Sequence, residues 1–310
     1  MTGALLGAVV GDAFGGPLEG ASASEMPRLV AARIARPSPW SYTDDGAMNI
    51  AVAESLVAAG TVDPEHLLHR FAAHYEPARG FGRGMKLALR AFASGTRWDR
   101  CAFAAWPEGS RGNGGAVRIT PVACVAWSSP AMFARAVELT TRVTHTHEEA
   151  VSAALVQANA ISLALPIDAG DLDPQAFLTQ LRGRVRDLPS WVNDALLEVG
   201  ALLRGNASPT EAGRVLGCSP LARESVFTAL WAFLAASETY ASAITTAALI
   251  GGDVDSICAM AGALAGALHG ASGIPEDWLQ NLAHESPTVK ALRALGERLG
   301  QLIPQDLAVV

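Results

Sequence analysis

Residues 251–270 read GGDVDSICAMAGALAGALHG, a glycine turn with two aspartates followed by mostly small apolar residues. Alanine and leucine favour helix, and small side chains let a neighbouring helix backbone approach closely. A similar stretch, GALLGAVVGDAFGG, occupies residues 3–16. We expect both stretches to form closely packed helices in the core, and the polar residues beside them to need a separate explanation.

Helical spacing of apolar residues extends over most of the chain. The clearest segments are residues 47–59, 67–74, 150–165 and 289–302. Helix starts are indicated where an N-cap oxygen precedes a proline, whose missing N–H costs nothing at the first helical position. Five such pairs occur: Asp63-Pro64, Ser129-Pro130, Asp173-Pro174, Ser208-Pro209 and Ser286-Pro287. These patterns predict an all-α protein, a compact bundle of many helices in a single domain over residues 1–310.

The composition argues against several classes of protein. With 310 residues, 50% of them hydrophobic, the chain is long enough to bury a large core. The net charge is −7 and the basic residues are scattered, which gives no sign of binding to nucleic acid or to an anionic membrane. No apolar stretch reaches the ~20 residues of a spanning helix, and the N-terminus lacks the basic region of a signal peptide. The four cysteines lie far apart, which favours reduced thiols in a cytoplasmic protein.

Two short acidic clusters stand at the starts of apolar segments. They are Thr43-Asp44-Asp45 and Asp253-Val254-Asp255-Ser256. Helix capping alone explains a single cluster, because Asp and Thr oxygens accept hydrogen bonds from the free N–H groups of a helix start. Two clusters of the same kind favour a shared role. Carboxylate and hydroxyl oxygens suit hard cations such as Mg²⁺, Mn²⁺ or Ca²⁺, and burying four aspartates together requires compensating positive charge, so the pattern indicates a site for divalent metal ions.

Six motifs, in order along nearly the whole chain, give the sequence a resemblance to a known family. They are GALLGAVVGDAFGGPLEG (residues 3–20), YTDDGAM (42–48), ARGFGRG (78–84), GNGGAVRITPVA (112–123), THTHEEAV (144–151) and GGDVDSICAMAGALAGALHG (251–270). The sequence resembles the ADP-ribosylglycohydrolases, which include the dinitrogenase reductase-activating glycohydrolase and the mammalian ADP-ribosyl-acceptor hydrolases. The resemblance implies a multi-helix orthogonal bundle that hydrolyses the glycosidic bond between ADP-ribose and a modified acceptor.

The same resemblance implies two Mg²⁺ ions as cofactors, or Mn²⁺ in their place. The residues implied for the first ion are Thr43, Asp44 and Asp45, and those for the second are Asp253, Asp255 and Ser256, with Asp255 as the bridge. Serine at 256 keeps the hydroxyl of the family's usual threonine. Gly46 and Ala47 replace the usual threonine and glutamine, which weakens the expected support around the first ion.

Three carboxylates are implied in catalysis: Glu19, Asp45 and Asp255. Glu19 follows the opening motif and matches a family glutamate at the edge of the site, where it would act as acid or base. An exposed loop carboxylate without a catalytic role is the alternative for Glu19.

Substrate contacts are expected from the glycine-rich segments. Glycines around Asn113 let backbone N–H groups approach a pyrophosphate, and a helix expected near Ala116 would present its positive end to that charge; a simple turn is the alternative. His145 would hydrogen-bond the ligand rather than a metal, and adenine would meet the guanidinium of Arg111 or the ring of Phe81. The residues implied in substrate binding are Phe81, Gly82, Ser110, Arg111, Gly112, Asn113, Gly114, Gly115 and His145.

The leading hypothesis is an enzyme that releases ADP-ribose from an ADP-ribosylated protein or another acceptor. One alternative is a catalytically weak protein that binds ADP-ribose, and another is a two-metal phosphohydrolase of an ADP-ribose-like pyrophosphate. The acceptor depends on surface loops, so the motifs do not identify it.

Overall fold

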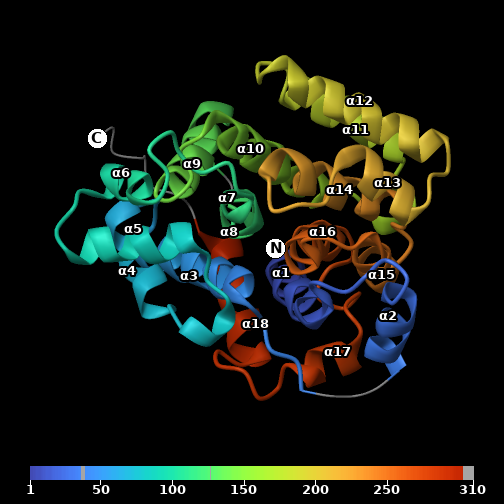
Figure 1. Ribbon diagram of the computed structural model, residues 1–310, viewed down its shortest axis with the longest axis horizontal. Coiled ribbons are helices and arrows are strands. Elements are labelled where there is room, and N and C mark those ends of the chain that lie inside the picture. Colours follow the sequence, from blue (N-terminus) through green and yellow to red (C-terminus); the bar gives the residue numbers. More distant parts are fainter. Residues whose placement is uncertain (36–38, 126, 303–310) are drawn as a thin grey trace.

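The computed structural model describes residues 1–35, 39–125 and 127–302, and in these ranges it contains helices and no β-strand (Figure 1). The first nine α-helices are α1 (Thr2–Gly15), α2 (Met26–Ala35), α3 (Asp44–Ala59), α4 (Pro64–Ala73), α5 (Arg83–Ala93), α6 (Trp98–Cys101), α7 (Gly114–Val117), α8 (Thr120–Ala123) and α9 (Pro130–Arg142). The next nine are α10 (Glu148–Ala164), α11 (Pro174–Arg184), α12 (Ser190–Arg204), α13 (Pro209–Leu216), α14 (Ala222–Ala235), α15 (Tyr240–Ile250), α16 (Val254–His269), α17 (Glu276–Asn281) and α18 (Val289–Gln301). Short 3₁₀ helices are η1 (Gly16–Leu18), η2 (Pro77–Arg79), η3 (Ala102–Ala104) and η4 (Ala169–Asp171). Across the described part of the chain, no helix is both long and apolar enough to cross a membrane.

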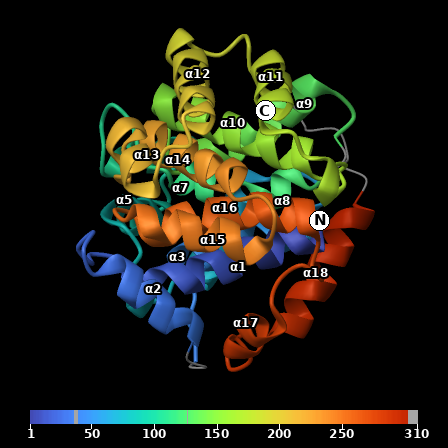
Figure 2. The ribbon, with the colours of Figure 1, turned by 90° about the vertical axis from the view of Figure 1, so that its right-hand side faces the viewer.

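Helices α1 and α16 lie side by side at the centre of the molecule and run antiparallel (Figures 1 and 2). From Gly3 onward, every fourth residue of α1 is a glycine that faces α16: Gly3, Gly7, Gly11 and Gly15. A Cβ atom at Gly7 would lie 2.2 Å from the carbonyl oxygen of Gly262, and one at Gly15 would lie 2.7 Å from the Cα of Asp255. The two helices therefore pack backbone against backbone, as their small residues predict. This packing brings the end of α1 that carries Asp12 next to the start of α16.

The other helices enclose this central pair. Helices α3 and α18 pack against α1, whereas α10, α14 and α15 pack against α16. Helix α4 packs on α3, and α12 and α13 pack on α14 to form an outer layer (Figure 1). The helices cross in several directions around one continuous apolar core, which confirms the predicted all-α orthogonal bundle.

Four of the five helix starts that were predicted at a proline are confirmed. Helices α4, α9, α11 and α13 each begin at the proline, and the preceding Asp or Ser side chain accepts a backbone N–H. The fifth prediction, a start at Ser286-Pro287, is wrong because α18 begins at Val289. Thr288 is its N-cap, and the Thr288 side chain accepts a hydrogen bond from the backbone N–H of Ala291 at 3.3 Å.

Candidate functional site

Asp12 is a fully buried carboxylate near the end of α1 that holds the turn before α3. Its Oδ2 accepts hydrogen bonds from the backbone N–H groups of Thr43 and Gly46, both at 2.8 Å. Its Oδ1 accepts a hydrogen bond from Thr43 Oγ1 at 2.7 Å. Burial and the neighbouring charge of Asp255 raise the pKa of Asp12 well above its usual range. These hydrogen bonds fix the turn that carries the first acidic cluster.

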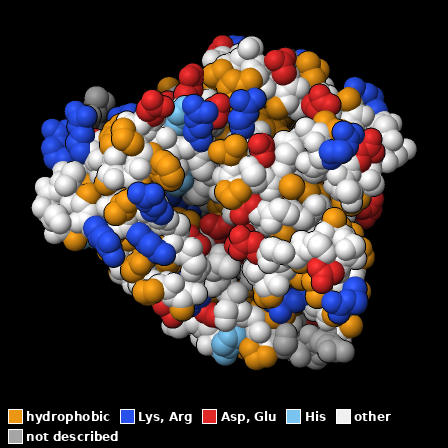
Figure 3. Space-filling view, in the orientation of Figure 1, with side chains coloured by type: hydrophobic (Ala, Val, Ile, Leu, Met, Phe, Trp, Pro, Cys, Tyr) orange, Lys and Arg blue, Asp and Glu red, His pale blue; other side chains and the backbone are white. Residues whose placement is uncertain are grey.

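The two acidic clusters predicted from the sequence meet beside Asp12. Ser256 Oγ donates a hydrogen bond to Asp45 Oδ2 at 2.6 Å, which joins the start of α16 to the start of α3. Two sets of three carboxylates each have oxygens within 4.8 Å of one another: Asp12, Asp45 and Asp255, and Glu19, Asp253 and Asp255. Figure 3 shows acidic side chains gathered at a hollow near the centre of one face of the molecule.

Negative charge accumulates in this cluster. Burial and the charge of Asp255 raise the pKa of Asp44 to about 7. Burial and the charge of Asp253 raise the pKa of Asp255 to about 6, and burial and Asp44 raise the pKa of Asp45 well above its usual range. Within the described residues, no basic side chain forms an ion pair with these aspartates. Hard oxygen donors with this excess of charge fit a divalent cation, which would stabilise their ionised forms.

Glu19 is an exposed carboxylate at the edge of the cluster, directly after η1. The charge of Asp255, and then partial burial, raise the pKa of Glu19. Its carboxyl group therefore keeps a proton to higher pH than an ordinary glutamate does, a property suited to proton transfer.

Gly46 contributes to the site through its backbone. Its N–H donates to Asp12, and a Cβ atom at this position would lie 2.7 Å from Asp12 Oδ2 and 2.7 Å from Tyr42 Cβ. The packing around the first acidic turn therefore leaves no room for a side chain at residue 46. The glycine therefore supports this turn through its backbone N–H.

The glycine-rich segment 109–115 packs closely against the helix α9 and the THTH motif that follows it. A Cβ atom at Gly109, where φ is +89°, would lie 2.5 Å from Thr146 Oγ1, and one at Gly115 would lie 2.5 Å from Thr141 Cγ2. The helix expected near Ala116 is the four-residue α7, which is too short to present a substantial dipole to a phosphate.

Asn113 is tied to the acidic cluster. Its Nδ2 donates to Asp253 Oδ2 at 2.5 Å and to Ser225 Oγ at 3.0 Å, and its backbone N–H donates to the carbonyl oxygen of Pro220 at 2.9 Å. Both donor groups of this buried residue are therefore engaged within the protein. This argues against its predicted role as a pyrophosphate ligand and favours a role in holding Asp253.

His145 lies against the same glycine-rich segment. Cβ atoms at Gly112 and Gly114 would each lie 3.3 Å from His145 Nε2, so this edge of the ring faces the loop backbone. Burial and the positive charge of Arg118 lower the pKa of His145 to about 3. The ring is therefore neutral at physiological pH.

The sequence and the fold are similar to those of known proteins. Residues 1–307 match the sequence profile of the ADP-ribosylglycohydrolases. The chain belongs to the ADP-ribosylglycohydrolase family. Its reaction class is therefore hydrolysis of an ADP-ribosyl bond, as the sequence motifs predict.

Individual relatives match the sequence of this glycohydrolase over nearly its whole length. ADP-ribosylhydrolase ARH3 of Bos taurus is 32% identical to it, over 90% of this chain and 87% of that protein. ADP-ribosylarginine hydrolase Tri1 of Pseudomonas putida (strain GB-1) is 28% identical, over 98% of this chain and 80% of that protein. A solved structure described as an ADP-ribosylglycohydrolase-related protein complex has a TM-score of 0.74 and 28% identity, and the match covers 97% of this chain and 96% of that one.

A cavity of about 620 Å³ adjoins the glycine-rich segment of the glycohydrolase. Its lining residues are Trp106, Pro107, Glu108, Gly109, Ser110, Arg111, Gly112, Pro220 and Leu221. Trp106 is 44% exposed, so much of its ring is accessible to a ligand. Phe81, by contrast, is 1% exposed and packs on Tyr75 with the ring centroids 5.0 Å apart, which argues against the predicted stacking of Phe81 on adenine.

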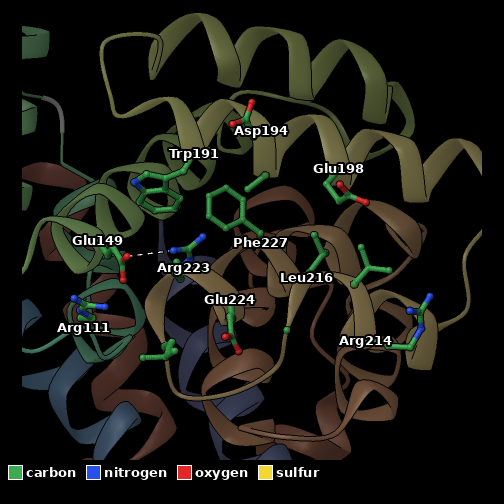
Figure 4. Close-up of a pocket in the computed structure, with 14 residues that line it drawn as sticks. Arg111, Glu149, Trp191, Asp194, Glu198, Arg214, Leu216, Arg223, Glu224 and Phe227 are labelled. Atoms are coloured by element: carbon green, nitrogen blue, oxygen red, sulfur yellow. Dashed lines mark hydrogen bonds and ion pairs between the residues drawn. The ribbon is translucent and has the colours of Figure 1, made fainter.

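A second cavity, of about 750 Å³, lies between α12 and the helices α13 and α14, and it shares Arg111 and Leu221 with the first (Figure 4). Arg223 Nη1 forms an ion pair with Glu149 Oε1 at 3.2 Å inside it, and Trp191 lies above this pair. Arg111 thus lines both cavities, whereas the predicted loop contact Gly82 lines neither.

Asp12 is the main site residue that the sequence analysis missed. It occupies a helix made almost wholly of small apolar residues, where a charged side chain is costly to bury unless it has strong partners. That isolated charge in an apolar helix is the signal that marks it.

Proposed function

We propose that this glycohydrolase cleaves its ADP-ribosyl bond with the help of two divalent cations, Mg²⁺ or Mn²⁺. The observation that carries the proposal is the convergence of buried aspartates from α1, α3 and α16, none of which forms an ion pair with a basic side chain of the described residues. The residues that would hold the ions are Thr43, Asp44, Asp45, Asp253, Asp255 and Ser256. Asp12 would act behind them by fixing the turn that contains Thr43.

The reaction adds one water molecule across the glycosidic bond. The water oxygen forms a bond to C1″ of the ribose, and the bond from C1″ to the acceptor atom breaks. The acceptor atom keeps the electron pair of the broken bond and gains a proton. Bound divalent cations would orient the ribose hydroxyls and polarise the attacking water. The products are ADP-ribose and the unmodified acceptor, which is a protein side chain or another ADP-ribosylated group.

Three carboxylates would handle the protons. Glu19 stands at the rim with a raised pKa, which suits a group that delivers a proton to the departing acceptor atom. Asp45 and Asp255 lie within 4.8 Å of each other at the buried end of the cluster and would take the proton that the water loses.

The two ends of the ADP-ribose would lie in neighbouring parts of the site. The distal ribose would meet the acidic cluster, and the adenosine half would enter the cavity beside Gly109–Gly112. There the exposed ring of Trp106 offers a face for the adenine, and the guanidinium of Arg111 offers a second planar contact. Ser110 lines this cavity, and His145 lies beside Gly112 and Gly114 of the same segment, so both would contact the ligand there.

Product analysis on the Asp255→Ala variant tests this proposal. A panel of ADP-ribosylated acceptors is incubated with the wild type and with the variant, with and without Mg²⁺. We expect free ADP-ribose from the wild type only when Mg²⁺ is present, and a loss of release from Asp255→Ala on every acceptor. Asp277→Ala, which removes an exposed aspartate on α17, is the matched control and should retain wild-type release.

Other products would point elsewhere. AMP in place of ADP-ribose would identify a phosphohydrolase, and tight binding of ADP-ribose without release from any acceptor would identify a binding protein. Wild-type release by Asp255→Ala would overturn the metal assignment.

A further inference from the structure

His145 is connected to the core through two other side chains. Arg118 is fully buried, and its Nη2 donates a hydrogen bond to Thr144 Oγ1 at 2.7 Å. Thr144 Oγ1 lies 2.7 Å from His145 Nδ1. The same guanidinium nitrogen donates to the carbonyl oxygens of Thr140 at 2.9 Å and Thr141 at 3.2 Å, so the end of α9 holds Arg118 in place.

The chemistry of the three groups sets the direction of these hydrogen bonds. A guanidinium group only donates, so Thr144 Oγ1 accepts from Arg118. Thr144 is 2% exposed, and among the described residues its hydroxyl group contacts no hydrogen-bond partner besides Arg118 and His145. A proton on Nδ1 would leave the hydroxyl hydrogen buried without an acceptor, which is unfavourable. The hydroxyl group therefore donates to Nδ1, and the ring carries its proton on Nε2.

The other edge of the ring faces the glycine-rich segment 109–115. Nε2 faces the backbone at Gly112 and Gly114, where the lack of side chains leaves this edge of the ring uncovered by the loop. No hydrogen-bond partner for Nε2 occurs in the part of the chain that the structure describes. A protonated Nε2 is a hydrogen-bond donor, so it requires an acceptor atom from whatever binds there.

We propose that Arg118 and Thr144 are positioning residues that hold His145 as a neutral ring protonated on Nε2, which makes it a fixed hydrogen-bond donor to an oxygen of the bound ADP-ribose. The identity of that ligand rests on the proposed function. With its proton on Nε2 and Nδ1 occupied by Thr144, the ring neither binds a metal ion nor takes up a proton during the reaction. Burial, and then the positive charge of Arg118, lower the pKa of His145, so both favour the neutral ring.

Nuclear magnetic resonance of the protein labelled with ¹⁵N-histidine tests the state of the ring directly. The His145 signals are assigned by their loss in His145→Gln. At pH 5.5 an ordinary histidine is mostly imidazolium, whereas we expect His145 to show an unprotonated Nδ1 and a protonated Nε2. Thr144→Val removes the hydroxyl group, and it should mix the two tautomers and weaken ADP-ribose binding by roughly threefold to tenfold, the loss expected for one hydrogen bond.

Two further variants separate the effects of shape, hydroxyl group and charge. Thr144→Ser keeps the hydroxyl group and should match the wild type in both measurements. Arg118→Met removes the buried charge and should increase imidazolium at pH 5.5; if this variant does not fold, the pair of Thr144 variants still decides the matter. A protonated Nδ1 in the wild type, or identical spectra for Thr144→Val and Thr144→Ser, would overturn the proposal. Absence of ADP-ribose binding by the wild type would contradict the proposed function instead, and the spectra would still test the ring.

Discussion

The carboxylate of Asp12 lies in an apolar helix, where its charge is costly to bury. Three hydrogen bonds from Thr43 and Gly46 compensate for part of that cost. Because these donors belong to the turn that starts α3, Asp12 sets the position of Asp44 and Asp45. In the proposed metal site, Asp12 would affect the bound ions through the ligands that it orients.

We predict that Asp12→Asn weakens Mg²⁺ binding by roughly 10- to 100-fold, the usual effect of losing an outer partner of a metal site. An amide has one acceptor oxygen where the carboxylate has two, so its NH₂ group faces either the backbone N–H groups of Thr43 and Gly46 or the hydroxyl group of Thr43, whose hydrogen then has to turn away from residue 12. Either arrangement loses a hydrogen bond that the turn donates to the carboxylate. Calorimetric titration with Mg²⁺ measures the change. Asp63→Asn, which alters an exposed N-cap of α4, is the control and should bind Mg²⁺ as the wild type does. Equal affinities for the wild type and Asp12→Asn would refute the assigned role.

At the scale of elements, the contact between α1 and α16 determines whether the acidic clusters meet. Glycines on both helices allow their backbones to touch, and the antiparallel arrangement places the last turn of α1 against the first turn of α16. Any increase in the distance between these helices separates Asp12 and Asp45 from Asp255. Stability and site geometry therefore depend on the same interface.

Gly7→Ala should destabilise the protein by at least about 1–3 kcal/mol, because its Cβ atom would lie 2.2 Å from a carbonyl oxygen of α16. We also expect weaker Mg²⁺ binding, since the start of α16 has to move. Denaturant unfolding and Mg²⁺ titration measure the two effects. Gly183→Ala in α11, where a Cβ atom meets nothing within 4 Å, should be neutral or stabilising by up to about 1 kcal/mol. Similar stability of the two variants would contradict the backbone contact.

For the whole molecule, the gathering of aspartates with raised pKa values in one hollow makes the stability of the fold depend on pH. Asp44 and Asp255 have pKa values of about 7 and about 6 in the folded protein, above the value of about 3.9 for an unfolded chain. The folded state therefore binds protons more tightly than the unfolded state does. In the absence of metal, stability is greatest below about pH 4 for these groups and is lost as the pH rises through 6 and 7.

The predicted outcome is that the metal-free protein melts at lower temperature at pH 8 than at pH 5. Added Mg²⁺ should raise the melting temperature more at pH 8 than at pH 5, because it stabilises the ionised carboxylates. Differential scanning calorimetry at both pH values measures this. Asp44→Asn removes one of the titrating groups and should show a smaller fall. A parallel fall in the wild type and Asp44→Asn would show that other groups are responsible.

Local features of the sequence were sufficient to predict the helices and most of the side chains that form the candidate site. Helical spacing and proline N-caps placed α4, α9, α11 and α13 correctly, and the motifs identified the family and the two acidic clusters. These signals are local because they depend on the hydrogen bonds and side chains of a few consecutive residues. The false start at Ser286-Pro287 arose because Thr288 is a competing N-cap two residues further on.

What the tertiary structure alone decided is which groups face one another. Asp12 accepts hydrogen bonds from Thr43 and Gly46, and Asn113 donates one to Asp253. Arg118 donates one to the hydroxyl group of Thr144. The partners in each contact are too far apart in the sequence for a local pattern to reveal them. The burial of Phe81 and the accessibility of Trp106 likewise follow from packing between distant elements. The sequence by itself determined the helices and the kind of site, because those depend on residue type and spacing. Contacts and pKa values depend on distances across the fold, and those distances exist only once α1 and α16 have packed together.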